Sequence, residues 1–472
     1  MLSGVVIWSI LVKRNDPFVL NVMNVENHHN MTLFPHQKQA CEWLWNRTGG
    51  LIWAATGVGK TLIALTYARA LIEHSGAKKI LIVCPASVKY QWQAEARKFY
   101  GIEAVVIEGS PAVRKELWEN EGAYKIVNYE LLLKDYKYAL SVNWDCICAD
   151  ECHRLANARA KTVKIIKKLS ARRKLALSAT PICNGKYDLF SQLDWISPEC
   201  LGRNWWSFRS EYCVMHNAFP KIIGYRNNDR FDHITAPLIH RIGKDVLTDL
   251  PPLTESVVPF TLSDRERRIY DRAKKELRIE LEGKKDLTIA NALVQLLRLR
   301  QITNTTRPFT GGVCVPSKLS TLIDLLSDVL ESPDAKVIMF TSFAGTAHDY
   351  YDDLLMHWKG VIITGDTPQG QRQEMLETFK NNADVRFILG TEALSTGLNI
   401  QAASIVIHID ETWSYSKYDQ RNGRSWRQGQ EKHVQVYSLI AKNSVDEYVH
   451  KIIEHKKNEV DITWNTIKEI LC

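Results

Sequence analysis

The sequence contains no apolar run long enough to cross a membrane. Its longest membrane-like stretch, Val5–Val12, is far shorter than the roughly 20 residues that a membrane helix needs. No basic segment precedes this stretch, so it also lacks the pattern of a secretory signal. Low-complexity tracts and short solenoid repeats are absent as well. We therefore expect a cytoplasmic protein that is not secreted and has no membrane partner, and we interpret residues 1–30 as a poorly ordered leader.

The ten cysteines form no recognisable disulfide or zinc pattern. In a long chain without a secretory signal they are typical of reduced intracellular thiols. A zinc site is the alternative for four neighbouring residues of ligand type: Cys146, Cys148, Cys152 and His153. No second close pair completes a tetrahedral site, so we interpret the three cysteines as small buried core residues.

Charge of either sign is not in large excess. The chain has 61 Lys and Arg against 53 Asp and Glu, a formal net charge of +8, which permits a polyanionic partner without requiring one. Hydrophobic residues make up 45% and charged residues 24%, a composition that excludes disorder for most of the chain. A length of 472 residues exceeds what one hydrophobic core supports and predicts two or three domains.

Short apolar runs of strand length alternate with longer amphipathic stretches, which indicates parallel sheets flanked by helices. In the first part of the chain the runs are Lys79–Cys84, Tyr124–Asn128, Asp145–Ala149 and Lys174–Leu177. In the last part they are Lys336–Phe340, Val361–Thr364, Val385–Leu389, Ser404–Ile409 and Val434–Leu439. We predict an α/β fold with two similar lobes, at residues 31–200 and 316–472, and a helical insertion between them at residues 201–315.

The first chemical motif is a loop of small residues that follows an apolar strand and precedes a helical run. Its sequence is Ala54-Ala55-Thr56-Gly57-Val58-Gly59-Lys60-Thr61. In this context backbone N–H groups can curl around phosphate oxygens, so a plain glycine-rich turn is the weaker alternative. Lys60 can reach the β- and γ-phosphates, and the Thr61 hydroxyl can bind Mg²⁺. The loop therefore predicts a site for ATP and Mg²⁺.

An acidic pair follows the predicted strand Asp145–Ala149. Because ligands bind at the carboxyl ends of parallel strands, Asp150 and Glu151 should lie at the same sheet edge as the phosphate loop. Asp150 is placed to hold Mg²⁺, and Glu151 to orient or deprotonate the attacking water. Taken alone, an Asp-Glu pair has little meaning, but together with the loop it predicts phosphoryl chemistry.

Several short motifs surround these residues. In the first half they are Leu33-Phe34-Pro35-His36-Gln37, Pro85-Ala86-Ser87-Val88-Lys89-Tyr90-Gln91-Trp92, Asn128-Tyr129-Glu130, and Ser178-Ala179-Thr180-Pro181 with Asn184. In the second half they are Phe340-Thr341-Ser342-Phe343, Thr391-Glu392-Ala393 with Thr396-Gly397-Leu398-Asn399, and Gln420-Arg421-Asn422-Gly423-Arg424-Ser425-Trp426-Arg427-Gln428-Gly429-Gln430. In this order the set resembles the motifs of superfamily 2 helicases over about residues 33–457.

The middle of the chain narrows the resemblance to the Swi/Snf-type DNA translocases. Three segments resemble those that border that family's inter-lobe insertion. In chain order they are Arg241–Leu247 with Leu250-Pro251-Pro252, Leu296–Gln301, and Ser317-Lys318-Leu319. Departures occur at Ala54, at Leu394-Ser395 and at Trp413-Ser414. By analogy with the family, the compact size of the chain indicates a prokaryotic or viral form, in the cytoplasm of a prokaryotic or virus-infected cell.

The resemblance implies two RecA-like lobes and assigns roles to individual residues. Gln37 would read adenine, and Arg424 and Arg427 would be arginine fingers that reach the γ-phosphate. Contacts to DNA phosphates would come from Ser87, Lys89, Asn128, Ser342 and Thr391. For four of these residues an ordinary solvated side chain is the alternative: Ser87, Lys89, Ser342 and Thr391.

The implied function is ATP-driven movement of a monomeric motor on double-stranded DNA, with remodelling of DNA or displacement of bound proteins. One alternative is a DNA or RNA helicase that separates strands, and another is a nucleotide-dependent switch that needs a protein partner. Trp205 and Trp206 could stack on bases, but aromatic pairs in a helical segment are more often core residues.

Overall fold

In the computed structural model the chain folds as two compact units that meet in sequence between Val246 and Leu247. The structure describes residues 33–183, 185–216, 222–247, 250–283, 289–311, 315–395 and 400–456. The predicted leader at residues 1–30 lies outside these ranges, as do Asn184 and the motif residues Thr396-Gly397-Leu398-Asn399. Among the residues described, no helix is both long and apolar enough to cross a membrane.

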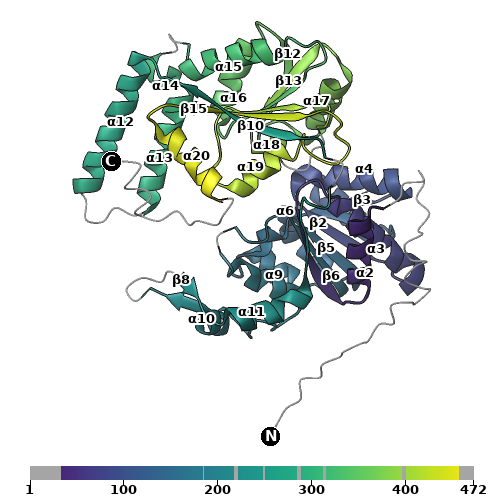
Figure 1. Cartoon of the computed structure of the whole chain (residues 1–472). Helices are drawn as coiled ribbons and strands as arrows, with labels where there is room; N and C mark the ends of the chain where they lie inside the picture. The colour runs from purple at the N-terminus through teal and green to yellow at the C-terminus, as the bar shows by residue number, and fades with distance from the viewer. Residues whose placement is uncertain are drawn as a thin grey trace. The chain divides into compact units, whose positions relative to one another are not determined.

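The first unit is built on a seven-stranded sheet with the order β3-β4-β2-β5-β6-β1-β9 (Figure 1). All of its strand pairs are parallel. The strands are β1 (Gly49–Ala54), β2 (Ile80–Cys84), β3 (Val105–Val106), β4 (Tyr124–Asn128), β5 (Trp144–Asp150), β6 (Ala171–Ser178) and β9 (Ile239–Ile242). The four runs predicted here are confirmed as β2, β4, β5 and β6, because fully buried parallel strands read as continuous apolar segments.

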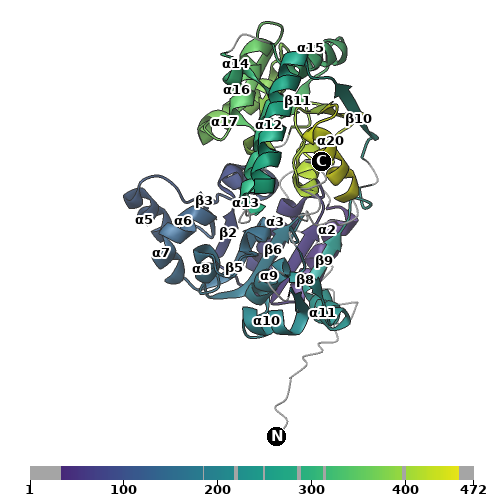
Figure 2. The same ribbon diagram turned by 90° about the vertical axis from the view of Figure 1, so that its left-hand side faces the viewer.

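Helices connect these strands and cover the sheet. They are α2 (Pro35–Trp45), α3 (Lys60–Ser75), α4 (Lys89–Tyr100), α5 (Pro111–Glu119), α6 (Tyr129–Lys134), α7 (Tyr136–Leu140), α8 (Lys161–Ile166), α9 (Asp188–Ile196), α10 (Trp205–Tyr212) and α11 (Asn228–Thr235). Figure 2 shows α5, α6 and α7 grouped on one side of this unit. A short antiparallel pair, β7 (Cys213–Met215) and β8 (Ile222–Tyr225), lies between α10 and α11 in sequence.

The second unit has a six-stranded parallel sheet with the order β10-β15-β14-β11-β13-β12. The strands are β10 (Leu253–Phe260), β11 (Val337–Phe340), β12 (Lys359–Ile363), β13 (Val385–Gly390), β14 (Ile405–His408) and β15 (Val434–Ala441). The five runs predicted here are confirmed as β11 to β15. The two parallel sheets with their helices confirm the predicted α/β architecture of two lobes.

The helices of the second unit include a long pair, α12 (Asp264–Gly283) and α13 (Ile289–Asn304), which pack side by side (Figures 1 and 2). The others are α14 (Arg307–Thr310), α15 (Ser317–Val329), α16 (Ala344–Leu354), α17 (Gln369–Asn381), α18 (Glu392–Ser395), α19 (Tyr415–Asn422) and α20 (Val445–Lys456). Buried residues of α13, α15 and α16 share one hydrophobic cluster with those of β11, β13 and β14. The α12–α13 pair is therefore anchored to the sheet of the second unit.

The segment predicted as a separate insertion, residues 201–315, is divided between the two units. Its strand β9 pairs with β1 at the edge of the first sheet, and β10 pairs with β15 at the edge of the second. The sequence did not predict these two strands because polar residues interrupt them: His240 and Arg241 in β9, and Thr254, Glu255 and Ser256 in β10. Pro259 within β10 fits this position, since a proline is tolerated on an edge strand.

Candidate nucleotide site and helicase motifs

The phosphate loop joins the carboxyl end of β1 to the amino end of α3, as its sequence predicts. Gly57 and Gly59 have φ values of 86° and 84°, in the left-handed region that other residues rarely adopt. A Cβ atom on Gly59 would lie 2.4 Å from Nε2 of Gln37. Glycine at this position is therefore required by both the backbone conformation and the neighbouring side chain.

The side chain of Gln37 supports the loop through hydrogen bonds. Its Nε2 donates to the carbonyl of Val58 at 3.1 Å, and its Oε1 accepts from the backbone N–H of Phe34 at 3.0 Å. The side chain of His36 also approaches the carbonyl of Val58, at 3.1 Å. Gln37 is only 1% exposed, so it supports the loop in this structure, a contact that the sequence did not reveal. Its role in reading adenine stays a prediction.

Lys60 begins α3 and turns its amine back across the loop. The Nζ atom donates to the carbonyls of Ala54 and Ala55, at 3.0 and 3.2 Å. Thr56 is buried within the loop, while Thr61 is half-buried in the first turn of α3. The backbone N–H groups at the start of a helix and the positive end of its dipole suit phosphate oxygens, and α3 begins at this loop.

Asp150 ends β5, and its carboxylate is held in place by two donors. The indole of Trp92 donates to Oδ2 and the N–H of Glu151 to Oδ1, each at 2.9 Å. Burial, and next the charge of Glu151, raise the pKa of Asp150 to about 6, although Trp92 and Lys60 oppose the shift. A divalent cation would relieve this cost, because it favours the ionised carboxylate. Asp150 and the Thr61 hydroxyl are oxygen ligands of the type that Mg²⁺ prefers.

Glu151 follows directly and adopts a left-handed backbone with φ of 52°. Such a conformation costs energy in a residue other than glycine and is common at functional sites. Its Oε2 lies 3.2 Å from Nδ1 of His153 and 3.5 Å from Oγ of Ser178. Ser178 in turn accepts from the N–H of Thr180 at 3.1 Å, which ties the acidic pair to the Ser178–Pro181 motif.

The cysteines near this pair are core residues. Cys146 and Cys148 are buried on β5, and burial raises the pKa of the Cys146 thiol to about 12. The Cys152 thiol donates to Oε1 of Gln192 at 3.1 Å. Within the described ranges no group of three or more His, Cys, Asp or Glu side chains is arranged to hold a metal.

Three of the predicted DNA contacts lie in the first unit, and two of them are engaged inside the protein. Ser87 is half-buried in the short helical turn after β2. Lys89 is 4% exposed, and its Nζ pairs with the carboxylate of Glu108 at 3.2 Å. Asn128 is also buried and donates to Glu130 at 2.7 Å. A phosphate at Lys89 or Asn128 would have to compete with these carboxylates.

In the second unit the predicted contacts Ser342 and Thr391 follow β11 and β13. The N–H of Ser342 donates to both carboxylate oxygens of Asp410, at 3.0 Å each. The N–H of Thr391 donates to the carbonyl of Ile363 at 3.2 Å. Sequence reasoning missed Asp410, because a single acid after a buried strand carries no motif of its own.

Arg424 and Arg427 lie in the turns that follow α19, and both are half-buried. The Nε of Arg424 donates to the carbonyl of Gln420 at 3.3 Å. Gln430 at the end of this run fixes the turns, because its Nε2 donates to the carbonyls of Gln401 and Ala403 at 3.0 and 3.1 Å. The preceding Arg421 is fully buried and belongs to the protein interior.

Comparison with known families agrees with these motifs. Residues 36–307 match the SNF2-related domain, and residues 317–429 match the helicase conserved C-terminal domain. The first match alone covers more than half of the chain. The chain belongs to the SNF2-related family. This confirms the family to which the sequence motifs pointed.

Relatives of this SNF2-related chain occur in bacteria and eukaryotes. It is 27% identical over 462 residues to an uncharacterized ATP-dependent helicase of Mycoplasma genitalium, covering 93% of this chain and 43% of that protein. It is 26% identical over 459 residues to the human SWI/SNF-related matrix-associated actin-dependent regulator of chromatin subfamily A member 1, covering 89% and 42%. The chain thus spans less than half the length of these curated relatives.

A solved structure is also similar to the SNF2-related chain. It is the Sulfolobus solfataricus SWI2/SNF2 ATPase core in complex with dsDNA, with 23% identity and a TM-score of 0.46. The match covers 90% of this chain and 92% of that chain.

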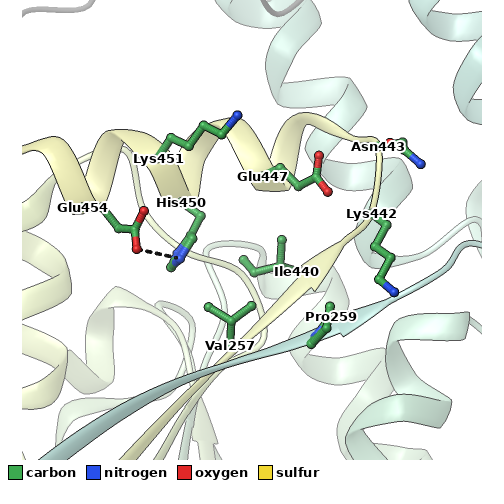
Figure 3. Close-up of a pocket in the computed structure, with 9 residues that line it drawn as sticks. All are labelled: Val257, Pro259, Ile440, Lys442, Asn443, Glu447, His450, Lys451 and Glu454. Carbon is green, nitrogen blue, oxygen red and sulfur yellow. Dashed lines mark ion pairs between the residues drawn. The ribbon is translucent and has the colours of Figure 1, made fainter.

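The SNF2-related chain also has features that its motifs do not include. Figure 3 shows a groove of about 530 Å³ between α20 and the strands β10 and β15. Its floor is apolar, from Val257, Pro259 and Ile440, and charged side chains of α20 form its rim. The groove is lined by none of the predicted site residues.

The two tryptophans of α10 differ from each other. Trp205 packs against Phe190 and Phe208, with ring centres 5.7 and 5.5 Å apart, as a core residue. Trp206 is 60% exposed, and the guanidinium of Arg209 lies 4.5 Å from its ring centre. The core interpretation was therefore wrong for Trp206, because neighbours in a helix point in different directions.

Proposed function

We propose that this SNF2-related chain is an ATP hydrolase that is stimulated by DNA and moves on the duplex. The observation that carries the proposal is the arrangement of Lys60, Asp150 and Glu151. Strands β1 and β5 of one parallel sheet deliver the phosphate loop and the acidic pair at their carboxyl ends. In such sheets this edge is where ligands bind.

Each residue of the first unit has a proposed role in this chemistry. The loop N–H groups and Lys60 bind the phosphates of ATP. Gln37 holds the loop in the conformation that requires the positive φ values of Gly57 and Gly59. Thr61 and Asp150 would hold Mg²⁺, which neutralises charge on the phosphates when it is bound. Glu151 orients the attacking water and accepts its proton. His153 and Ser178 keep the Glu151 carboxylate in place.

The second unit contributes Arg424 and Arg427, which we propose act on the γ-phosphate. An arginine side chain remains charged at all working pH values and matches the geometry of phosphate oxygens. Supplying it from a separate unit makes hydrolysis depend on domain closure. Contacts to the DNA backbone through both units then convert this cycle into movement, and such contacts weaken with salt.

The test is steady-state ATP hydrolysis with Mg²⁺ in the presence of duplex DNA, single-stranded DNA, RNA or no nucleic acid. We expect duplex DNA to stimulate most. Glu151→Gln should reduce turnover by roughly a hundredfold or more, because it removes the proton acceptor. Glu103→Gln is the control, since Glu103 pairs with Arg97 on the surface and is none of the predicted site residues. Displacement of a triplex-forming strand then reports movement on the duplex.

Other outcomes would replace the proposal. Stimulation by single strands or RNA alone, with unwinding of a duplex, would identify a strand-separating helicase. Hydrolysis that no nucleic acid changes would favour a switch that works with a protein partner. Normal turnover in Glu151→Gln would remove this residue from its role.

A further inference from the structure

A cluster of buried charges in the second unit joins residues that lie far apart in the sequence. At its centre is Asp410, which follows β14 and is 2% exposed. Its carboxylate accepts from Nη2 of Arg300 at 3.0 Å and from Nδ2 of Asn304 at 3.1 Å. Both partners belong to α13, so this helix is held to the end of a central strand by charged and polar contacts.

The same carboxylate fixes the segment after β11. It accepts the N–H of Ser342 and the hydroxyl of Thr341. Arg300 also faces this segment, since its guanidinium lies 5.4 Å from the ring centre of Phe343 and 5.6 Å from that of Trp413. The side chain of Arg300 is thus enclosed between two aromatic rings and the Asp410 carboxylate.

Arg421 extends the cluster to α19 and α18. Its Nη1 donates to the backbone carbonyl of Asp410 at 3.0 Å. Its Nη2 donates to Glu392 at 2.7 Å and lies 3.3 Å from Oγ of Ser342. Arg421, itself part of the 420–430 motif, therefore contacts the other two motifs of this unit. Removing a charge from such a site leaves another charge buried without compensation.

We propose that Arg300 and Asp410 are positioning residues that set how the second unit engages DNA. They do so by fixing the backbone N–H of Ser342 and the start of the 420–430 turns relative to α13. This inference rests on the proposed function, because it assigns the predicted contacts at Ser342 to DNA. It adds that α13, which contains no nucleotide-site residue, controls these contacts.

A second buried ion pair in the same core provides a matched control. Nζ of Lys318 pairs with Oδ2 of Asp446 at 2.8 Å, and both side chains are nearly inaccessible. Lys318 also donates to Asn304, which is a partner of Asp410 as well, so the two pairs share this one residue. Among the described residues, the side chains of Lys318 and Asp446 form no hydrogen bond with residues 341–343 or with Arg421. If both pairs only stabilise the fold, replacing either pair should change the DNA requirement of hydrolysis to a similar extent. If Arg300 and Asp410 position the DNA contacts, only their replacement should raise this requirement.

The experiment measures the duplex DNA concentration that half-saturates ATP hydrolysis, together with kcat, the KM for ATP and the unfolding midpoint. The variants are Arg300→Lys, the neutral pair Arg300→Met with Asp410→Asn, and the control pair Lys318→Met with Asp446→Asn. Arg300→Lys keeps the charge and the fold but loses the planar guanidinium that fits between the two rings. The neutral pair removes both charges together, which avoids an uncompensated one.

We expect both Arg300 variants to raise the half-saturating DNA concentration by roughly tenfold, because small displacements of positioned groups have large effects. The KM for ATP should stay unchanged. The control pair should leave the DNA requirement at the wild-type value, whatever its unfolding midpoint.

Either of two results would overturn this inference and leave the proposed function standing. One is an unchanged DNA requirement in both Arg300 variants. The other is a rise in the DNA requirement that the control pair also shows, in proportion to the fall in its unfolding midpoint. A wild-type protein whose hydrolysis does not respond to DNA would overturn the proposed function and this inference together. The wild-type measurement therefore distinguishes the two failures.

Discussion

The two units place their functional residues by different physical means. In the first unit the phosphate loop is a short local segment, and its backbone conformation and N–H groups form the proposed phosphate site. In the second unit the motif residues are held by a buried cluster of Asp410, Arg300 and Arg421, in which Arg300 lies 110 positions from Asp410. The first unit should therefore be sensitive to backbone changes, and the second to the loss of one charge.

The largest effect should follow a change in the loop backbone. Gly59→Ala places a methyl group against Gln37 in a left-handed conformation that alanine disfavours. We expect it to reduce nucleotide affinity by roughly a hundredfold or more, because the loop must distort to accept the new side chain. Titration with a fluorescent ATP analogue measures this loss.

Gly76→Ala is the matched control for that change. Gly76 is also left-handed, with φ of 69°, but it ends α3 and a Cβ there meets nothing within 4 Å. It should lower the free energy of unfolding by about 1 kcal/mol and leave nucleotide binding intact. Equal losses of nucleotide affinity in both variants would contradict the special role of the loop backbone.

The loss of one buried charge in the second unit should act on stability, with a smaller effect on nucleotide affinity. Lys318→Met leaves the Asp446 carboxylate buried without its cation. We expect the free energy of unfolding to fall by about 3–5 kcal/mol. Denaturant titration of the full chain measures it, followed through a probe placed in the second unit. Adding Asp446→Asn should recover much of the loss.

Lys359→Met tests whether burial decides that outcome. Lys359 pairs with Asp384 at 2.9 Å in the same unit, but both side chains are about two-thirds exposed or more. Exposed pairs contribute little because water and salt screen them. The unfolding midpoint should not change. A loss of stability similar to that of Lys318→Met would mean that burial does not decide how much an ion pair contributes.

The smallest effect should be a pH dependence at the rim of the groove in Figure 3. His450 lies 3.0 Å from the buried carboxylate of Glu411 and 3.5 Å from Glu454. Glu411 raises the pKa of His450, against an opposing effect of burial. The stabilisation is therefore complete below about pH 6.5 and is lost as the pH rises through the higher pKa of the folded state.

Unfolding of wild type and His450→Gln between pH 5.5 and about 9 would measure this contribution, which should be below about 1 kcal/mol. The difference between the two proteins should shrink toward high pH. A difference that grows with pH would mean that the histidine is neutral in the folded protein.

Local patterns explain what the sequence could predict. Nine strands were found because each contains a mainly apolar run, and the phosphate loop was found because its residues are adjacent. Strands β9 and β10 were missed because polar residues, among them Arg241 and Glu255, interrupt any such run. The role of Asp410 was missed because its partners Arg300 and Ser342 are 110 and 68 positions away. Only the folded chain brings such residues together.

The connection between the units has a mechanical consequence. It leaves the end of β9 and enters the start of β10, and each is the outermost strand of its sheet. Force applied along the axis of either strand loads its hydrogen bonds in shear, those of β9 with β1 or those of β10 with β15, so that each row must yield as a whole. An attachment of this kind resists being peeled open one bond at a time.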